Sequence, residues 1–589
     1  LNPAAFGDWR NQLVFIGDDE DSNQHTDDAD EIANKIKNSF PYFNINKLYL
    51  DAYPQVNTLG GDRVPALTEA INKAIFKGAL VMTYLGHGGP KGWAQERILS
   101  ISDITAWDND QRTPLLVTAT CTFAGYDDPV FVTAGEEVIL NPKGGAMALM
   151  TTTRAVFANS NADLTEKALY RLFQPVDGHA ASLGEAMRLS KNTFTGESSV
   201  VNARKFALLG DPAQQIALPA YKVATTFVDA HDVADGLLDT LRALQRVTIK
   251  GIVTDETGQL LQDFNGAVFP TVYDKAQSIS TLGQDEDSFV KTFILQKNVL
   301  FKGRATVLNG QFTFTFVVPK DINYQYGRGR ISYYAADVDA MRDASGFYDG
   351  IVIGGTFPGA LADDQGPVVE VFMNTEDFVF GGITNDKPVL LAKLRDDNGI
   401  NVVGNSIGHD LDGVLDNNTQ NTYLLNDFYE AELDDYTRGT VRYPLAKLAE
   451  GRHTMRVKAW DVANNSAEGY TEFIVANSEK IALEHVLNYP NPFTDRTCFQ
   501  FDHNMAGQEL DVLIQIYTVS GRLVKSLEHT MVSDGAMRLG DCIDWDGRDD
   551  YGDRLARGVY LYKVKVRSRL TTDNTLNGES DFEKLVILK

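Results

Sequence analysis

The residues best able to do chemistry in this chain are a histidine and a cysteine, each of which follows a short apolar run. His87 stands between glycines in the segment YLGHGG, residues 84–89, and Cys121 ends the segment TPLLVTATC, residues 113–121. A thiolate is a strong nucleophile, and a nearby imidazole can take the proton of a thiol and later give it to a leaving amine. Together the two residue types indicate acyl transfer through a cysteine nucleophile.

Two apolar runs, 80–85 and 115–118, are expected to carry these residues to one edge of a sheet. Both have the length of buried parallel strands, and consecutive strands of such sheets are usually neighbours. Ligands bind beyond the carboxyl ends of these strands. His87 and Cys121 would then share a rim, and the glycines at 86, 88 and 89 would leave backbone N–H groups free to bind an oxyanion.

Each residue also has a structural interpretation. His87 alone could be part of an ordinary strand-to-loop turn, and a free cysteine such as Cys121 is often a small buried hydrophobic residue. Only nine histidines and three cysteines occur in 589 residues. Two scarce, reactive residue types at the ends of adjacent predicted strands favour the catalytic interpretation.

Residues 1–220 alternate between strand and helix signals. This alternation predicts an α/β domain with a mainly parallel sheet covered on both faces. The sequence Asp-Leu-Thr-Glu at 163–166 resembles a helix start. The expected strands are 12–16, 47–50, 80–85, 115–118 and 146–150, and the expected helices are 30–37, 64–76, 131–140, 163–173 and 182–192.

The rest of the chain has the short strands and the Gly, Asn and Asp punctuation of β-sandwiches. Residues 311–318, for example, alternate with the period of a half-buried strand. The fold class is therefore multidomain, an α/β domain followed by all-β domains, and only the α/β domain has evident chemistry. The all-β domains are a β-sandwich at 221–362, an Ig-like domain at 363–480 and a further β-sandwich at 481–589.

The composition of the chain limits the classes of partner and site that we expect. The chain has 54 Lys and Arg against 80 Asp and Glu, a net charge of −26, and nucleic-acid binding needs a basic face, so no nucleic acid is expected. No apolar run reaches the roughly 18 residues of a membrane-spanning helix. Three cysteines are no disulfide framework, although Cys498 and Cys542 lie in one β-rich region where they could pair. The acid-rich loop 18–21 could hold calcium.

A histidine-glycine pair after one strand and a cysteine after the next resembles the caspase-like (clan CD) cysteine peptidases, and more closely the gingipain family, C25. The resemblance shows in YLGHGGPKGW at 84–93, in the strand leading to Cys121 and in LLGDP at 208–212. It covers about residues 8–218 and implies a caspase-like fold. The gingipain catalytic unit has two such halves, and this chain resembles the second, so we expect an N-terminal portion to be missing from it.

The resemblance implies roles for individual residues. Cys121 would be the nucleophile, His87 the general base and acid, and the backbone N–H groups of Gly88 and Cys121 the oxyanion hole. The family also places an acid after its first strand to orient the histidine. Asp19 is the match, with Asp18 or Glu20 as alternatives, and a solvated loop or a calcium site is the other interpretation of these acids.

The same resemblance points to substrate contacts. Phe157 matches an aromatic residue that walls the P1 pocket of arginine-specific members, with ordinary core packing as the alternative. Trp93 is assigned to substrate binding with the His87 motif. The segment 21–28 lacks a clear match for the acidic P1 selector, so no Arg or Lys preference is expected. No catalytic metal or required cofactor is implied, and a structural calcium ion remains compatible with the sequence.

The C-terminal segments NYPNPF at 488–493, WDGRDD at 545–550 and GVYLY at 558–562 resemble the C-terminal domains of type IX secretion substrates of Bacteroidetes. Combined with a gingipain-like domain, they imply a sortase associated with the outer face of the outer membrane. Such an enzyme removes C-terminal signal domains from cargo proteins and transfers the acyl group to an amine on anionic lipopolysaccharide. An outer-membrane β-barrel partner would hold its C-terminal domain. The alternatives are a secreted gingipain-like hydrolytic endopeptidase and a non-catalytic surface adhesin or scaffold.

Overall fold

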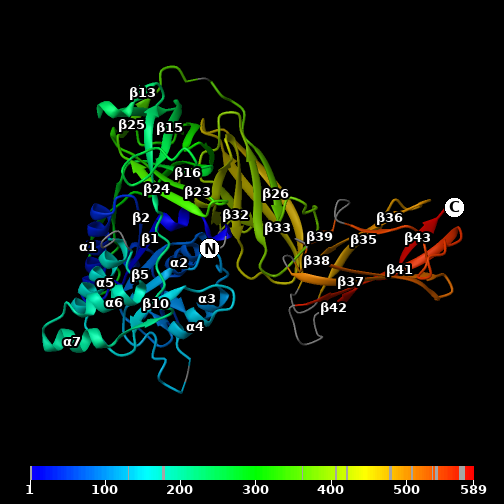
Figure 1. The fold of residues 1–589 in the computed structure, drawn as a ribbon, viewed down its shortest axis with the longest axis horizontal. Coiled ribbons are helices and arrows are strands. Elements are labelled where there is room, and N and C mark those ends of the chain that lie inside the picture. Colours follow the sequence, from blue (N-terminus) through cyan, green and yellow to red (C-terminus); the bar gives the residue numbers. More distant parts are fainter. Residues whose placement is uncertain are drawn as a thin grey trace. The chain divides into compact units, whose positions relative to one another are not determined.

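The computed structural model describes residues 3–588 except 131, 175–179, 361, 405–407, 420–421, 477–480, 506–507, 533–534, 538–541 and 570–576. The chain divides into two compact units, Leu1–Val318 with Ile322–Gly359 and Pro319–Asp321 with Ala360–Lys589 (Figure 1). This division lies close to the boundary expected at 362. The boundaries expected at 220 and 480 fall inside the units and stay predictions.

A six-stranded sheet organises the first 210 residues. Its strands are β1 (Gln12–Gly17), β2 (Asn44–Tyr49), β5 (Val81–Leu85), β9 (Leu115–Ala119), β10 (Ala148–Thr152) and β11 (Phe206–Leu209). Their order is β11-β10-β9-β5-β1-β2, and every neighbouring pair is parallel except β10 with β11. The predicted mainly parallel sheet is confirmed, and so is the adjacency of the two strands that precede His87 and Cys121.

Helices cover both faces of this sheet because its strands present apolar side chains alternately to either side. Leu13 and Phe15 of β1 belong to a core shared with α1 and α5, whereas Val14 and Ile16 belong to a second core shared with α2 and α4 (Figure 1). The helices are α1 (Gln24–Ser39), α2 (Pro65–Lys77), α3 (Ile101–Ala106), α4 (Ala134–Leu140), α5 (Ala158–Phe173), α6 (Leu183–Lys191) and α7 (Glu197–Arg204).

One predicted helix start is wrong. Helix α5 begins at Ala158 with Phe157 as its N-cap, so the 163–166 segment lies inside the helix. Asp163 does not cap this helix: its carboxylate accepts a hydrogen bond from Lys167, one turn later, at 2.7 Å. Such an i,i+4 pair stabilises a helix interior and looks like a cap in sequence.

The β part of the first unit is built on a sheet that closes on itself. Strand β12 pairs with β15 on one side and, in parallel, with β24 on the other, where Tyr221 is opposite Ala344. The sequence predicts a sandwich of two separate sheets for this segment. In the structure, the β12–β24 pairing joins the two edges of one sheet. The strands are β12 (Tyr221–Val228), β13 (His231–Asp232), β15 (Arg246–Thr254), β16 (Gly266–Tyr273), β19 (Val299–Lys302), β20 (Ala305–Leu308), β21 (Gln311–Val317), β23 (Arg330–Asp337) and β24 (Arg342–Tyr348).

Shorter strands complete the first unit. Strands β17 (Gln277–Ser280) and β18 (Thr292–Leu295) form a hairpin whose connecting loop is important for the site described below. The others are β3 (Val56–Thr58) with β4 (Gly61–Arg63), and β14 (Asp239–Ala243) with β25 (Ile351–Thr356) and β22 (Gly327–Arg328).

The second unit is all-β. Its first sheet has the order β26-β28-β32-β31 and its second the order β27-β34-β33-β29-β30. The strands are β26 (Val368–Met373), β27 (Ile383–Thr384), β28 (Val389–Arg395), β29 (Asp412–Leu415), β30 (Thr422–Leu424), β31 (Tyr429–Glu432), β32 (Asp435–Pro444), β33 (Gly451–Trp460) and β34 (Ser466–Val475).

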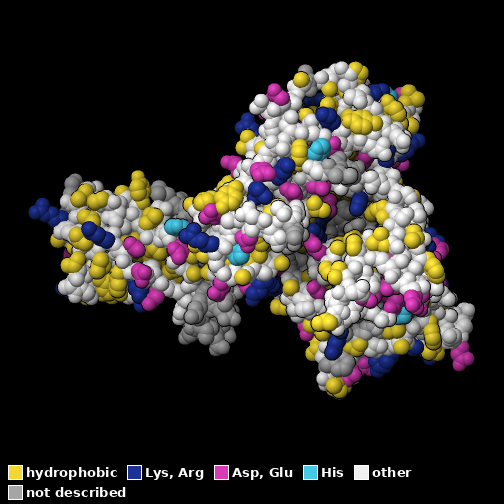
Figure 2. All heavy atoms as spheres, turned by 180° about the vertical axis from the view of Figure 1, so that it is seen from behind, with side chains coloured by type: hydrophobic (Ala, Val, Ile, Leu, Met, Phe, Trp, Pro, Cys, Tyr) yellow, Lys and Arg dark blue, Asp and Glu magenta, His cyan; other side chains and the backbone are white. Residues whose placement is uncertain are grey.

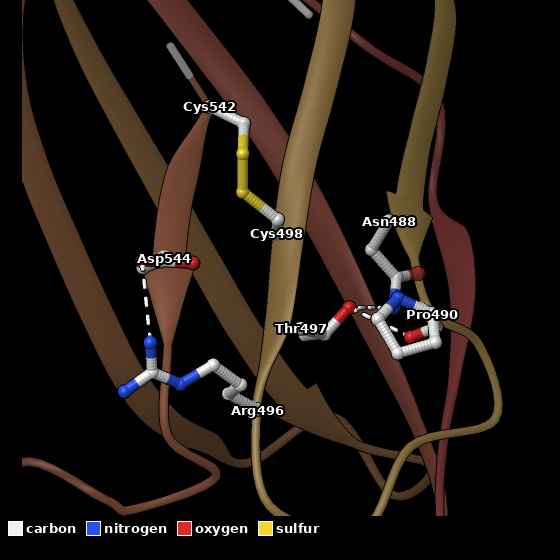
Figure 3. The surroundings of a disulfide bond; sticks show 7 residues. All are labelled: Asn488, Pro490, Arg496, Thr497, Cys498, Cys542 and Asp544. Carbon is white, nitrogen blue, oxygen red and sulfur yellow. Dashed lines mark hydrogen bonds and ion pairs between the residues drawn. A yellow bond between two sulfur atoms is a disulfide. The ribbon is translucent and has the colours of Figure 1, made fainter. Parts of the chain in front are cut away.

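The last strands of the chain form two sheets around a core of their own, drawn from residues 481–587. Strand β36 pairs with β40, and next to this pairing a disulfide joins Cys498 to Cys542 with their Cα atoms 5.6 Å apart (Figure 3). The pairing of Cys498 with Cys542, which the sequence left open, is therefore present in the structure. The strands are β35 (Leu483–Tyr489), β36 (Thr497–His503), β37 (Glu509–Thr518), β38 (Leu523–Val532), β39 (Ala536–Met537), β40 (Ile543–Trp545), β41 (Gly558–Ser568), β42 (Asn577–Glu579) and β43 (Glu583–Ile587).

The surface carries charged side chains of both signs among exposed hydrophobic ones (Figure 2). Figure 2 shows acidic and basic side chains interspersed over one face of the molecule. Among the described residues, no helix has the length and apolar character needed to cross a membrane.

Candidate active site

Strands β5 and β9 bring His87 and Cys121 to the same edge of the sheet. The two strands are parallel, and Leu85 is opposite Ala119 at their carboxyl ends. His87 and Cys121 each lie two residues beyond this pair. The chain therefore leaves both strands at the same level, as the sequence predicts, and both residues emerge at the edge where open α/β sheets bind ligands.

The segment after His87 folds into a small antiparallel sheet of β6 (Gly88–Gly89), β7 (Gly92–Trp93) and β8 (Leu99–Ser100). Gly88 packs closely against the residue before the cysteine, since a Cβ atom on Gly88 would lie 2.6 Å from Thr120 Oγ1. Any side chain at 88 would push the two loops apart. This contact keeps the backbone at 88 next to the backbone that leads into Cys121.

A buried carboxylate holds the backbone of His87. Asp18 Oδ2 accepts a hydrogen bond from the His87 N–H at 2.7 Å, and the Tyr84 hydroxyl donates to the His87 carbonyl at 2.6 Å. Asp18 and Tyr84 are both fully buried. Burial raises the pKa of Asp18 to about 8, against the lowering effect of the hydrogen bond from His87. Asp18, one of the alternatives for the orienting acid, therefore acts on the main chain of His87.

The acids at the imidazole itself are Asp21 and Glu20. His87 Nε2 lies 3.1 Å from Asp21 Oδ2 and 3.5 Å from Glu20 Oε2. With Nε2 occupied by these acids, Nδ1 is the ring nitrogen left for proton exchange with a substrate or thiol. Glu20 was an alternative for this position, whereas sequence reasoning did not assign Asp21 to it. Asp21, Ser22 and Asn23 all have positive φ, and this left-handed turn aims the Asp21 carboxylate at the ring.

The structure does not bring Asp19 to the imidazole. Its side chain is fully buried, and neither carboxylate oxygen has a hydrogen-bond partner within the described part of the chain. Burial, with smaller contributions from the charges of Asp18 and Glu96, raises the pKa of Asp19 to about 8. Because the Asp19 side chain points into the protein, Glu20 and Asp21 contact the imidazole of His87 in its place.

A loop from the β part of the unit fixes this acidic turn. Asn23 donates to the carbonyl of Phe289 at 2.7 Å and accepts from the N–H of Phe289 at 2.5 Å. Nearby, the carboxylate of Asp51 accepts hydrogen bonds from the N–H groups of Gly283 and Gln284 at 2.6 and 3.1 Å. The β17–β18 loop therefore helps to position the residues around His87.

Cys121 is a free, partly exposed thiol in a bend after β9. Its sulfur accepts a hydrogen bond from Val156 N at 3.5 Å and lies 3.8 Å from Val156 O. Among the described residues, no hydrogen bond links this sulfur to His87. The Cys121 N–H has no backbone acceptor in the same part of the chain, which is compatible with the predicted oxyanion role of Cys121 and Gly88.

The two predicted substrate-binding residues have different surroundings. Phe157 follows Val156, its side chain is 64% exposed, and the Lys205 ammonium lies 5.4 Å from its ring, so ordinary core packing is wrong for it. Trp93, in contrast, is fully buried and stacks on Tyr84 with the ring centroids 4.4 Å apart. The Trp93 ring supports the His87 loop from within the core, and Trp93 is also one of the residues that line the cavity beside His87, so its substrate contact stays a prediction.

An open cavity of about 810 Å³ borders the site on the histidine side. His87 lines it together with the β6–β8 segment, including Lys91 and Arg97, whereas Cys121 is not part of its wall. As for calcium, no three carboxylates of the 18–21 loop converge within 4.8 Å of one another in the described part of the chain. The structural calcium ion considered for that loop stays a prediction.

A comparison with protein-family models matches residues 2–217 to peptidase family C25. This part of the chain belongs to peptidase family C25. The C25 match spans the whole six-stranded sheet, so Cys121 and His87 lie on a cysteine peptidase domain. Their individual roles remain predictions.

The chain is also similar to solved structures. Dimeric latent PorU from Porphyromonas gingivalis is 31% identical, with 76% of this chain and 41% of that chain covered and a TM-score of 0.31. The Arg-specific cysteine proteinase gingipain R (RgpB) is 14% identical, with 57% and 67% covered and a TM-score of 0.31. The chain thus spans about two fifths of the length of the PorU chain. No curated protein matches the chain.

Proposed function

We propose that this C25 domain is the catalytic domain of a cell-surface transpeptidase, a PorU-like sortase that processes type IX secretion cargo. The observation that carries the proposal is the parallel β5–β9 pairing, which delivers a free thiol and an imidazole to one sheet edge. It is joined by the C25 match and by the resemblance of the C-terminal segments to type IX modules.

In the first half-reaction, the Cys121 thiolate attacks the carbonyl carbon of the bond before the cargo's C-terminal signal domain. Negative charge develops on the carbonyl oxygen, where the N–H groups of Gly88 and Cys121 would bind it. His87 then gives a proton to the leaving amine as the C–N bond breaks, and the cargo stays attached to sulfur as a thioester. Asp21 and Glu20 stabilise the imidazolium in the proton-transfer steps.

In the second half-reaction, an amine of anionic lipopolysaccharide attacks the thioester. His87 takes the proton of this amine, the C–S bond breaks, and a new amide forms while the thiolate is restored. Water competes for the same intermediate. The His87 side chain is 41% exposed in this structure. Transfer to the amine therefore outpaces hydrolysis of the thioester only if the amine is positioned or water is excluded.

The C-terminal β-sandwich is proposed as the attachment module. It has its own apolar core, and its disulfide closes a loop with a sequence separation of 44, a constraint worth about 4 kcal/mol in the chain-entropy model. An outer-membrane β-barrel partner that holds this module would keep the C25 domain at the cell surface, where signal-bearing cargo arrives.

The proposal is tested by incubating the full chain with a cargo protein that carries a C-terminal signal domain, over a range of amine concentrations. Mass spectrometry should show an amide adduct whose share rises with amine concentration. Only hydrolysed product at every concentration would instead identify a hydrolytic endopeptidase. Normal processing by Cys121→Ala would leave only the scaffold alternative.

A further inference from the structure

A second imidazole lies beside His87, and the proposed reaction does not use it. One ligand atom from each of His25, His87 and Asp21 lies within 4.8 Å of the other two. His87 Nε2 is 3.1 Å from Asp21 Oδ2, and His25 Nε2 is 3.5 Å from the same oxygen. The two rings meet edge to face with centroids 5.1 Å apart. Two imidazoles and one carboxylate therefore surround a common point.

The buried nitrogen of His25 lies at an ion-pair distance of 3.5 Å from Asp21 but makes no hydrogen bond within the described residues. The residue is 6% exposed, and its Nε2 atom is inaccessible to solvent and forms no hydrogen bond among the described residues. A buried polar atom without a hydrogen bond destabilises the folded state, so its retention calls for a ligand or another use.

The spacing of these atoms suits zinc. Zn²⁺ binds imidazole nitrogen and carboxylate oxygen at about 2.0–2.2 Å with tetrahedral geometry, which places neighbouring ligand atoms about 3.3 Å apart. The distances of 3.1 and 3.5 Å from Asp21 to the two nitrogens lie on either side of this value. Three protein ligands would leave a fourth position for water or for a neighbouring acid.

The local charge also favours a dication. Glu20 Oε2 lies 3.5 Å from His87 Nε2, so two carboxylates face the ring nitrogen. The Asp21 side chain is 54% exposed and the His87 side chain 41%, which gives an ion direct access from solvent. The point between the three ligand atoms is therefore open to solvent on the side of Asp21 and His87, is surrounded by negative charge, and is bordered on its buried side by His25.

We propose that His25, His87 and Asp21 form a zinc site and that zinc bound there switches the peptidase off. Coordination uses the lone pair of His87 Nε2, so the ring's one proton stays on Nδ1, and Nδ1 can no longer accept a proton from the thiol or the amine. No covalent bond is made or broken, and removal of the metal restores the base. The zinc site stands on its geometry alone, whereas the inhibition rests on the proposed function.

The binding test uses the full chain with Cys121→Ala, so that no free thiol competes for the metal, and titrates it with Zn²⁺ by calorimetry. One ion per chain is expected, and a further His25→Gln change should weaken binding by about 100-fold or more. His485→Gln is the matched control, because His485 is a half-exposed histidine with a carboxylate partner far along the chain. Equal affinity with and without His25, or no binding at all, would overturn the site.

A second arm measures cargo processing by the chain with Cys121 intact, with and without zinc. Zinc should inhibit the unmodified protein, and His25→Gln should need about 100-fold more zinc for the same fractional inhibition. Each protein is compared with its own zinc-free rate. Binding without any zinc-free activity would refute the proposed function but not the site, whereas activity that is equally sensitive in both proteins would refute the site.

Discussion

The Asp18 carboxylate accepts a hydrogen bond of 2.7 Å from the backbone N–H of His87. The carboxylate comes from the end of β1 and the histidine from the end of β5, and these strands are parallel neighbours. A side chain on one strand thus fixes the main chain of the loop that carries the proposed base. The position of His87 depends on this buried acid as well as on the acids at its ring.

Replacing Asp18 by Ala should remove this support. The loss leaves a partly buried N–H without an acceptor, so we expect a destabilisation of about 1 kcal/mol, measured by urea unfolding. Cargo cleavage should fall as the His87 loop shifts. Asp18→Asn, which keeps an acceptor oxygen, is the control and should lose less of both. Equal stability and activity in all three proteins would contradict the role of Asp18.

Asp19 predicts a pH dependence of stability. Its pKa is raised to about 8 in the folded protein and is close to 3.8 in the unfolded chain. Between these values the folded state binds more protons, so the contribution of Asp19 to stability is fully present below about pH 4 and is lost as the pH rises through about 8. Asp19→Asn, which stays neutral, should therefore become more stable relative to the unmodified chain as the pH rises.

This relative gain should be on the order of 1 kcal/mol per pH unit at most between pH 5 and 8. Unfolding free energies of the two proteins at several pH values measure it. A difference that stays constant over this range, or that falls with rising pH, would show that the Asp19 carboxylate is charged in the folded protein.

Phe157 and Trp93 should respond differently to truncation. Phe157 is largely exposed beside the cysteine loop, so Phe157→Ala should raise KM for cargo while changing the unfolding free energy by no more than about 0.5 kcal/mol. Trp93 is fully buried, and Trp93→Ala should cost about 3–5 kcal/mol. Steady-state kinetics with thermal unfolding separates the two. A Phe157→Ala protein with unchanged KM would remove Phe157 from the substrate site.

The contact between Asn23 and Phe289 should matter for activity. Asn23→Ala removes both hydrogen bonds to the Phe289 backbone and puts an alanine at φ 66°. Asn23→Gly also removes the bonds but tolerates this backbone conformation. Both variants should lower cargo cleavage by on the order of 10- to 100-fold if the bonds position the acidic turn. Normal activity of the glycine variant would mean that only the backbone conformation matters.

The sheet could be predicted because its signal is local. Residues 80–85 and 115–118 are short continuous apolar runs, and parallel strands buried on both faces read in this way. Their adjacency followed from a general rule about consecutive strands. The start of α5 was missed because Asp163 looks like a cap in sequence but pairs with Lys167 inside the helix.

The residues that contact His87 could not be predicted from local sequence patterns. Three consecutive non-glycine residues, 21–23, adopt positive φ, and their turn is held by Phe289, more than 260 positions away. No local sequence pattern predicts such a turn. Sequence reasoning therefore expected Asp19 at the His87 imidazole and did not assign Asp21 to it. The burial of the Trp93 ring could not be read from the sequence either, since it depends on the packing of this ring against Tyr84.

Cys121 and His87 are proposed to act on each other at one sheet edge, so the alkylation rate of Cys121 by iodoacetamide at pH 7 should depend on the imidazole. The other two cysteines are paired, so mass spectrometry of the modified chain reports Cys121 alone. An adjacent imidazole takes up the thiol proton, so the unmodified chain should react on the order of 10-fold or more faster than His87→Gln. Equal rates in the two proteins would show that the imidazole of His87 does not act on the thiol of Cys121.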